Sequence, residues 1–169
     1  AEDKDPIDTA IIDKANDSGA GSRLAEYKVS KFKPFDPVSK RTEATAEDGK
    51  GTTLHVTKGA PQVILALSSD ENNVDPALES QVNECVERFG NKGYRSLGVA
   101  VSTDGNKWSF SGIIPLYDPP RDDSESTIRM AENMGVDVKM ITGDHAAVAK
   151  EIAKEVSLGS NIISADEIM

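Results

Sequence analysis

Apolar residues recur at two different spacings along this chain, and the two spacings predict its elements. In residues 6–15, apolar positions fall every three or four residues, which predicts a helix. Asp5 can cap this helix, and Pro6 suits its first position, because no amide hydrogen is needed there. The same spacing predicts helices over 62–67, 76–89, 124–134 and 146–156. Alternation predicts strands over 26–35, 41–46, 52–58, 95–102 and 107–116.

Several smaller expectations follow from the same pattern. Tyr27, Val29 and Phe32 are spaced as the half-buried face of a strand would be. Polar residues predict loops over 17–22 and 68–75. Apolar residues at helical spacing predict that Cys85 fills a core.

The order of these elements divides the chain into two parts. Up to about residue 116, glycine-containing turns at 47–51 and 103–106 join strands as hairpins, which predicts an antiparallel α+β part. After residue 121, a predicted strand over 136–141 and a strand-like pair at 162–163 alternate with helices. That order is typical of a parallel sheet, so we predict the α/β class for the whole chain. Two prolines stiffen the crossing at 118–121.

Composition narrows the range of functions. The 169 residues carry a net charge of −10, which argues against nucleic acid and anionic membrane surfaces as partners. A nucleotide needs only a few local cations, so the net charge does not argue against ATP. A single cysteine excludes an internal disulfide, and two distant histidines show no metal-ligand spacing. No stretch approaches the roughly 20 apolar residues that span a bilayer. Because the chain begins with Ala1 and ends in a strand-like pattern, we expect a segment of a longer protein.

Six short motifs carry the most information, and they do so through their order. They are Asp5 to Ile11 (Asp-Pro-Ile-Asp-Thr-Ala-Ile), Lys33 to Thr42 (Lys-Pro-Phe-Asp-Pro-Val-Ser-Lys-Arg-Thr), Lys58 to Pro61 (Lys-Gly-Ala-Pro), Arg95 to Ala100 (Arg-Ser-Leu-Gly-Val-Ala), Pro115 to Arg121 (Pro-Leu-Tyr-Asp-Pro-Pro-Arg) and Met140 to Asp144 (Met-Ile-Thr-Gly-Asp). Together they resemble the nucleotide-binding region of P-type cation-transporting ATPases, and within that family the plasma-membrane proton pumps. The resemblance covers nearly the whole chain.

The resemblance implies a domain plan and a set of partners. Residues 1–116 would form the nucleotide-binding (N) domain, 117–121 a hinge, and 122–169 part of a haloacid-dehalogenase-like phosphorylation (P) domain. The implied ligand is ATP, with Mg²⁺ accompanying the nucleotide in the full-length protein. The remaining phosphorylation, actuator and transmembrane domains of the same polypeptide would be the partners. The segment would lie at the cytosolic face of the plasma membrane without touching the membrane itself.

The resemblance also assigns nucleotide-binding residues. Phe35 would stack on adenine, where a ring offers a flat face at low entropic cost. Lys58 would lie deep in the adenine pocket, and Gly59 would let the backbone approach closely. Lys40 would lie near the nucleotide, Asp8 would accept from the adenine amino group, and Arg95 would reach the phosphates or ribose. The residues alone also allow a core Phe35, a solvated Lys40 and an Arg95 paired with a neighbouring acid.

Two further groups would connect this site to catalysis. Asp118 and Arg121 resemble the hinge, while Thr142, Gly143 and Asp144 resemble a turn that helps arrange phosphoryl transfer. Read without the family, that turn simply leads from a strand into a helix, with Asp144 as its N-cap and His145 as a surface residue beside it. The Asp-Lys-Thr-Gly-Thr motif and the Gly-Asp-Gly-x-Asn-Asp loop of the family are absent. We therefore expect no catalytic residue, no metal ligand and no useful ATP hydrolysis from this chain alone.

Other functions remain open at this stage. The chain could be an interaction module with a degenerate, empty pocket, although Phe35, Lys58 and Arg95 are all retained. It could serve a pump for another cation such as calcium, since the Asp-Pro-Pro-Arg segment is widely shared. A free-standing dehalogenase-type phosphatase is disfavoured, because the nucleophilic aspartate is missing.

Overall fold

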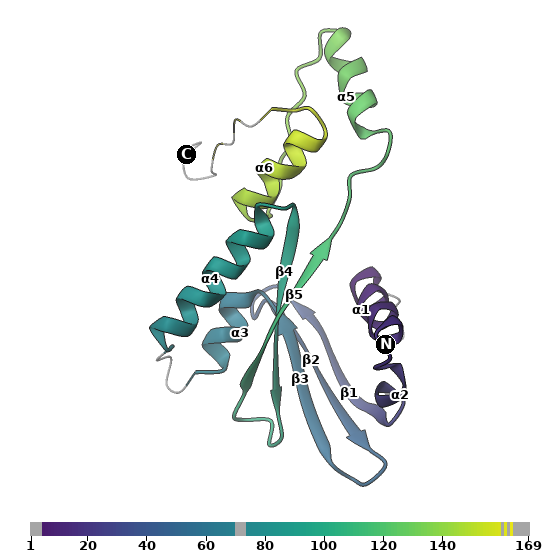
Figure 1. Ribbon diagram of the computed structural model, residues 1–169, viewed down its shortest axis with the longest axis vertical. Helices are drawn as coiled ribbons and strands as arrows, with labels where there is room; N and C mark the ends of the chain where they lie inside the picture. Colours follow the sequence, from purple (N-terminus) through teal and green to yellow (C-terminus); the bar gives the residue numbers. More distant parts are fainter. Residues whose placement is uncertain (1–4, 70–73, 160, 162, 164–169) are drawn as a thin grey trace. The chain divides into compact units, whose positions relative to one another are not determined.

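A five-stranded antiparallel sheet with flanking helices confirms the predicted α/β class (Figure 1). The computed structural model describes residues 5–69, 74–159, 161 and 163. The strands lie in the order β1-β2-β3-β4-β5. In chain order the elements are α1 (Pro6–Asp17), α2 (Gly21–Leu24), β1 (Tyr27–Asp36), β2 (Arg41–Asp48), β3 (Thr53–Gly59), α3 (Pro61–Leu67), α4 (Pro76–Gly90), β4 (Tyr94–Ser102), β5 (Ser109–Tyr117), α5 (Ser124–Asn133) and α6 (Ala146–Glu155).

The chain forms two compact units. Residues 1–79 and 97–114 make the first unit, and residues 80–96 and 115–169 make the second. The second unit therefore takes in a stretch that the predicted domain plan gives to the N domain. Compactness alone does not identify a family's domains, so the boundaries at 116, 117–121 and 122 stay predictions.

In the first unit, helices lie on both faces of the sheet. Gly59 and Gly98 are paired across β3 and β4, and a Cβ on Gly98 would lie 2.9 Å from Pro61 and 3.2 Å from Ile64 of α3. Paired residues of antiparallel strands point to the same face, so α3 covers this face of the sheet. The buried side chains here include Thr57, Pro61, Ile64, Leu65, Ala100 and Ser102. Lys58 points to the opposite face, where it meets α1.

The start of α1 forms as predicted. Asp5 accepts a hydrogen bond from the backbone N–H of Ile7 at 2.8 Å, and Pro6 occupies the first helical position. The loop predicted over 17–22 is only partly correct, because α2 begins at Gly21. Ala20 has helical backbone angles and precedes this single turn, so the polar composition of 17–22 concealed it.

The half-buried face predicted for the first strand is wrong. Tyr27, Val29 and Phe32 are 41%, 53% and 47% exposed, and every residue of β1 is exposed. Alternation shows which residues share a face of a strand, but it does not show whether anything covers that face. β1 is one of the two edge strands of the sheet, and the described part of the chain leaves its apolar residues open to solvent.

In the second unit, the end of α4 packs closely on the start of α6. A Cβ on Gly90 would lie 2.9 Å from the Cβ of Ala147, so only glycine permits this approach. Cys85 is half-buried, and its Sγ lies 3.6 Å from Nη2 of Arg88, which corrects the prediction that it fills the core. The buried apolar residues of this unit are Val82, Val86, Val148, Ala149, Ala153 and Val156.

In the same unit, contacts of two tyrosine rings join β4, β5 and α6. The ring centroids of Tyr94 and Tyr117 lie 5.4 Å apart, edge to face. The Tyr117 hydroxyl donates to Glu155 on α6, with 3.2 and 3.3 Å to the two carboxylate oxygens. Partial burial, followed by the negative charge of Glu155, raises the pKa of Tyr117. The end of β5 is thereby attached to the end of α6.

The strand predicted over 136–141 does not form. These residues have no regular secondary structure, and Val136 and Ile141 are 54% and 97% exposed. A parallel strand requires neighbours that accept and donate its backbone hydrogen bonds, and the described residues supply none here. The strand predicted at 162–163 lies partly outside the described residues. No described helix has the length and apolar character needed to cross a membrane.

Candidate functional site

A bulge in β1 places Phe35 at the same level of the sheet as Lys58. Lys33 pairs with Glu43 and Asp36 pairs with Arg41, so Pro34 and Phe35 both lie opposite Thr42. Thr42 in turn pairs with Lys58 on β3. Phe35 and Lys58 therefore flank the same residue of β2, two strand spacings or about 10 Å apart along the sheet.

The exposure of Phe35 argues against a core position, and its stacking on adenine stays a prediction. Its side chain is 61% exposed, so it does not fill a core within the described structure. Val38, in the turn that follows, is 90% exposed. An exposed aromatic ring beside a turn is available to stack on a flat ligand.

The turn from β1 to β2 is held by its own backbone and by one carboxylate. Asp36 accepts hydrogen bonds from the backbone N–H groups of Val38 at 3.2 Å and Ser39 at 3.0 Å. A hydrogen bond with the Ser39 side chain is the largest cause that lowers the pKa of Asp36, and the two backbone bonds lower it further. Lys40 has a left-handed backbone with φ of 52° and donates its N–H to the Asp36 carbonyl at 2.7 Å.

The same turn contacts the end of β3. The Lys40 carbonyl accepts a hydrogen bond from the backbone N–H of Ala60 at 3.3 Å. A Cβ on Gly59 would lie 2.4 Å from that carbonyl oxygen, a distance that no side chain can adopt. Gly59 is thus required by the approach of the protein's own backbone, whether or not a ligand also comes near.

Lys58 and Asp8 form an ion pair that sequence reasoning missed. The Lys58 ammonium donates to the Asp8 carboxylate of α1, and their side chains are 19% and 26% exposed. The two residues were assigned separately to the nucleotide, and nothing in their spacing of 50 positions indicates that they meet. One N–H of the ammonium is engaged, which leaves two further donors for a ligand.

On the face of the sheet that carries α3, a second group of charged side chains pair with one another. Glu43 accepts from Lys33 and from Arg41, each at 3.1 Å, and the Arg41 guanidinium lies 5.8 Å from the ring centre of Trp108. Burial alone would raise the pKa of Glu43, but the two cations lower it overall. These contacts support the strands, and the charges they use are already paired.

Arg95 belongs to the second unit, where two carboxylates hold it. Its Nε and Nη2 donate to Oδ2 of Asp144 at 3.1 and 2.9 Å, and Nη1 lies 3.4 Å from Oδ2 of Asp118. Arg95 thus does pair with acids, while its contact with a nucleotide stays a prediction. The structure brings together one predicted phosphate-binding cation, one predicted hinge residue and one residue of the Thr142–Asp144 turn.

The other predicted residues of this unit are less engaged. Asp144 donates its backbone N–H to the Thr142 hydroxyl at 3.1 Å, and Arg121 forms only a long, exposed ion pair with Asp123 at 3.8 Å. A Cβ on Gly143 would meet open space. The predicted N-cap is wrong by one residue: His145, not Asp144, caps α6, accepting through Nδ1 from the backbone N–H of Ala147 at 3.3 Å.

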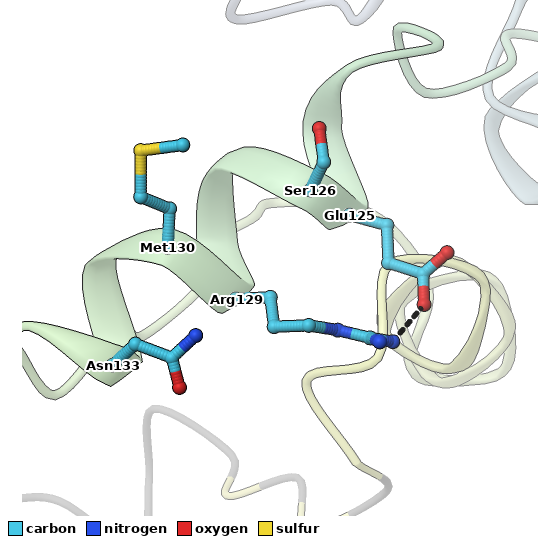
Figure 2. Close-up of a pocket in the computed structure, with 5 residues that line it drawn as sticks. All are labelled: Glu125, Ser126, Arg129, Met130 and Asn133. Carbon is cyan, nitrogen blue, oxygen red and sulfur yellow. Dashed lines mark hydrogen bonds and ion pairs between the residues drawn. The ribbon is translucent and has the colours of Figure 1, made fainter.

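Two surface hollows of the second unit are lined by other residues. One, of about 380 Å³, is lined by five residues of α5 (Figure 2), where Arg129 reaches back to Glu125. The other, of about 430 Å³, is lined by residues of α4 from Glu84 to Lys92 and the turn after it. Each is bounded mainly by a single helix surface, and neither contains a predicted nucleotide-binding residue. In the part of the chain that the structure describes, no group of three His, Cys, Asp or Glu side chains could hold a metal ion.

Comparison with known proteins identifies the family. The family model for the cytoplasmic domain N of P-type ATPases matches residues 3–123. A proposed cation-transporting ATPase of Methanocaldococcus jannaschii is 47% identical over 168 residues, which is 99% of this chain and 20% of that protein. Plasma membrane ATPase 1 of Candida albicans and of Schizosaccharomyces pombe are each 39% identical over 165 residues, 97% of this chain and 18% of each protein.

A family model that matches most of the chain settles the class: this chain belongs to the P-type ATPase cytoplasmic N-domain family. It spans about a fifth of the length of these relatives.

Proposed function

We propose that this chain binds ATP for a P-type ion pump, with adenine held between Phe35 and Lys58. The observation that carries the proposal is the register, which sets an exposed aromatic ring and a half-buried ammonium on either side of Thr42. Stacking on a ring together with a cation suits a purine that bears phosphates. Membership of the N-domain family supports the same ligand.

The remaining residues have supporting roles in the proposal. Lys40 contributes positive charge at the edge of the site, and Gly59 permits the close approach of the turn. Asp8 orients the Lys58 ammonium and can also accept from the adenine amino group. For Arg95, in the second unit, the proposal keeps the role that the family resemblance implies, a contact with the phosphates or ribose, for which it would leave Asp144 or use another N–H.

The parent protein would complete the reaction. The chain would present the γ-phosphate to an aspartate elsewhere in the polypeptide, with Mg²⁺ accompanying the nucleotide and with Asp118 and Arg121 in the hinge. Thr142, Gly143 and Asp144 would support the transfer. The plasma membrane ATPases among the relatives favour a proton pump at the cytosolic face of the plasma membrane. A pump for another cation such as calcium is the alternative, and transport assays on the parent would separate the two.

Titration with ATP, followed by the amide chemical shifts of the chain, tests the proposal. We expect ATP to shift amides in 34–42 and 57–61. ATP at ten times its dissociation constant should also stabilise the fold by about 1.4 kcal/mol, because only the folded chain binds it. Shifts confined to the hollows on α4 and α5, or no stabilisation at all, would favour an interaction module with an empty pocket.

A further inference from the structure

The turn between β1 and β2 joins three of the proposed nucleotide residues in one rigid corner. Phe35 stands immediately before the turn, and Lys40 ends it. The Lys40 carbonyl receives the N–H of Ala60, two residues after Lys58. A change in the path of this turn would therefore move the ring, and it would disturb the end of the strand that carries the ammonium.

Asp36 is the residue whose hydrogen bonds fix the backbone conformation of the β1–β2 turn. Its two carboxylate oxygens accept separately from the N–H groups of Val38 and Ser39, and its own carbonyl accepts from Lys40. Lys40 is not a glycine, so its φ of 52° costs free energy and persists only because neighbouring bonds hold it. The pKa of Asp36 is lowered by its hydrogen bonds to Ser39 and Val38, so the carboxylate stays ionised at neutral pH.

We propose that Asp36 is a positioning residue of the nucleotide site, which sets Phe35 and the Lys40 backbone in the geometry that adenine requires. The proposal rests on the proposed function, since the ligand is the same ATP. Asp36 acts through its neighbours and needs no contact with the nucleotide itself. A ring that is already oriented loses less freedom on binding than one on a loose turn.

Asp48 provides a matched control at the other end of β2. Its Oδ1 accepts from the N–H groups of Lys50 at 2.8 Å and Thr52 at 2.7 Å, and these bonds likewise lower its pKa. Asp48 therefore closes the β2–β3 turn much as Asp36 closes the β1–β2 turn. The eight-residue strand separates the two turns by roughly 23 Å, beyond the reach of one nucleotide base.

The experiment measures the ATP dissociation constant and the urea midpoint of the chain and its variants. We expect Asp36→Ala to weaken ATP binding about 3- to 10-fold, part of the loss that removal of the stacking ring itself would cause. Asp48→Ala should lower the urea midpoint similarly and leave the dissociation constant unchanged. Asp36→Asn keeps one acceptor oxygen, so it should recover part of the affinity.

A combined variant separates positioning from general destabilisation. If Asp36 acts through the ring, adding Asp36→Ala to Phe35→Ala should cause little further loss of affinity. Equal losses in Asp36→Ala and Asp48→Ala, or full additivity with Phe35→Ala, would overturn the inference while ATP binding stands. Failure of the unaltered chain to bind ATP would overturn the proposed function and this inference with it.

Discussion

Lys58 in the first unit and Arg95 in the second are both cations paired with carboxylates, but their surroundings differ. Lys58 is 19% exposed and meets one carboxylate, that of Asp8. Arg95 is 49% exposed and meets two, those of Asp144 and Asp118. Water screens the second set far more than the first, so the number of partners does not measure the strength of the pairing.

The two pairings also have different consequences for a ligand. A ligand that approaches Lys58 finds an ammonium already oriented by a helix and a strand, with donors left over. A phosphate that approaches Arg95 competes with one exposed carboxylate, that of Asp118, and one partly buried carboxylate, that of Asp144. Arg95 itself is 49% exposed, so water already screens both contacts. Under the proposed function, the Lys58 ammonium would meet the base already oriented, whereas Arg95 would exchange its carboxylate partners for phosphate at low cost.

Replacement of the aromatic ring should give the largest effect. Phe35→Ala should weaken ATP binding by about 1–3 kcal/mol, the usual contribution of a base stacked on a ring. Phe32→Ala is the control, since Phe32 lies on the same edge strand, is 47% exposed and pairs with Ala44. Calorimetric titration with ATP measures both. Equal losses of ATP affinity in the two variants would show that Phe35 does not hold the base.

Removal of each cation in turn should show the effect of burial. Lys58→Met leaves Asp8 partly buried without a cation, so unfolding without ATP should become easier by about 1–3 kcal/mol. Arg95→Met should cost about 0–1 kcal/mol, because Arg95 is 49% exposed and water already screens its ion pairs. Urea unfolding of the two variants gives the difference. If Arg95→Met proves as destabilising as Lys58→Met, exposure is not what separates the sites.

A smaller effect should distinguish the two partners of Arg95. Asp144 receives two N–H groups at 3.1 and 2.9 Å and is 28% exposed, whereas Asp118 lies 3.4 Å away and is 71% exposed. Asp144→Asn should destabilise the fold by about 0.5 kcal/mol and Asp118→Asn by about 0 kcal/mol. The difference should vanish in about 1 M salt, where the screening length is short. A difference that persists in high salt would mean that Asp144 acts through shape rather than charge.

The sequence predicted the first unit better than the second, because more of the first unit's features depend on residues that are close together in the chain. Hairpin turns, the Asp5 cap and the Lys58–Pro61 corner depend on residues close together in the chain, so local patterns reveal them. The strand expected over 136–141 depends on neighbours to pair with, and its apolar residues could not show whether those neighbours were present. The exposed face of β1 escaped prediction for the same reason.

Contacts between residues far apart in the chain were likewise not predicted within the candidate site. The family resemblance pointed to Phe35, Lys58 and Arg95 as residues, but it did not reveal that Asp8 meets Lys58 or that Asp144 meets Arg95. Pairs 50 and 49 positions apart leave no trace in periodicity. The capping role of His145 was missed because a histidine is an uncommon cap, while the aspartate before it is a common one.

The turn between β4 and β5, whose carboxylate accepts from backbone N–H groups and a hydroxyl, tests how far charge matters in the first unit. Oδ1 of Asp104 accepts from the N–H groups of Lys107 at 2.8 Å and Asn106 at 2.9 Å and from the Ser102 hydroxyl at 2.9 Å. These bonds, that from Lys107 being the largest cause, lower the pKa of Asp104 from 3.8 to about 2. Because the folded-state pKa is the lower one, ionised Asp104 stabilises the fold above pH 3.8, and this contribution is lost as pH falls through about 2.

Asp104→Ala should therefore lower the urea midpoint at neutral pH, and its difference from the unaltered chain should shrink as pH falls from 3.8 toward 2. The neutral side chain of Asp104→Asn can still accept from the turn, so it should retain part of the stability at neutral pH and gain on the unaltered chain in acid. Urea titrations of the three proteins at several pH values measure this. A constant difference between Asp104→Ala and the unaltered chain across that range would mean that backbone geometry, and not the ionised carboxylate, holds the turn.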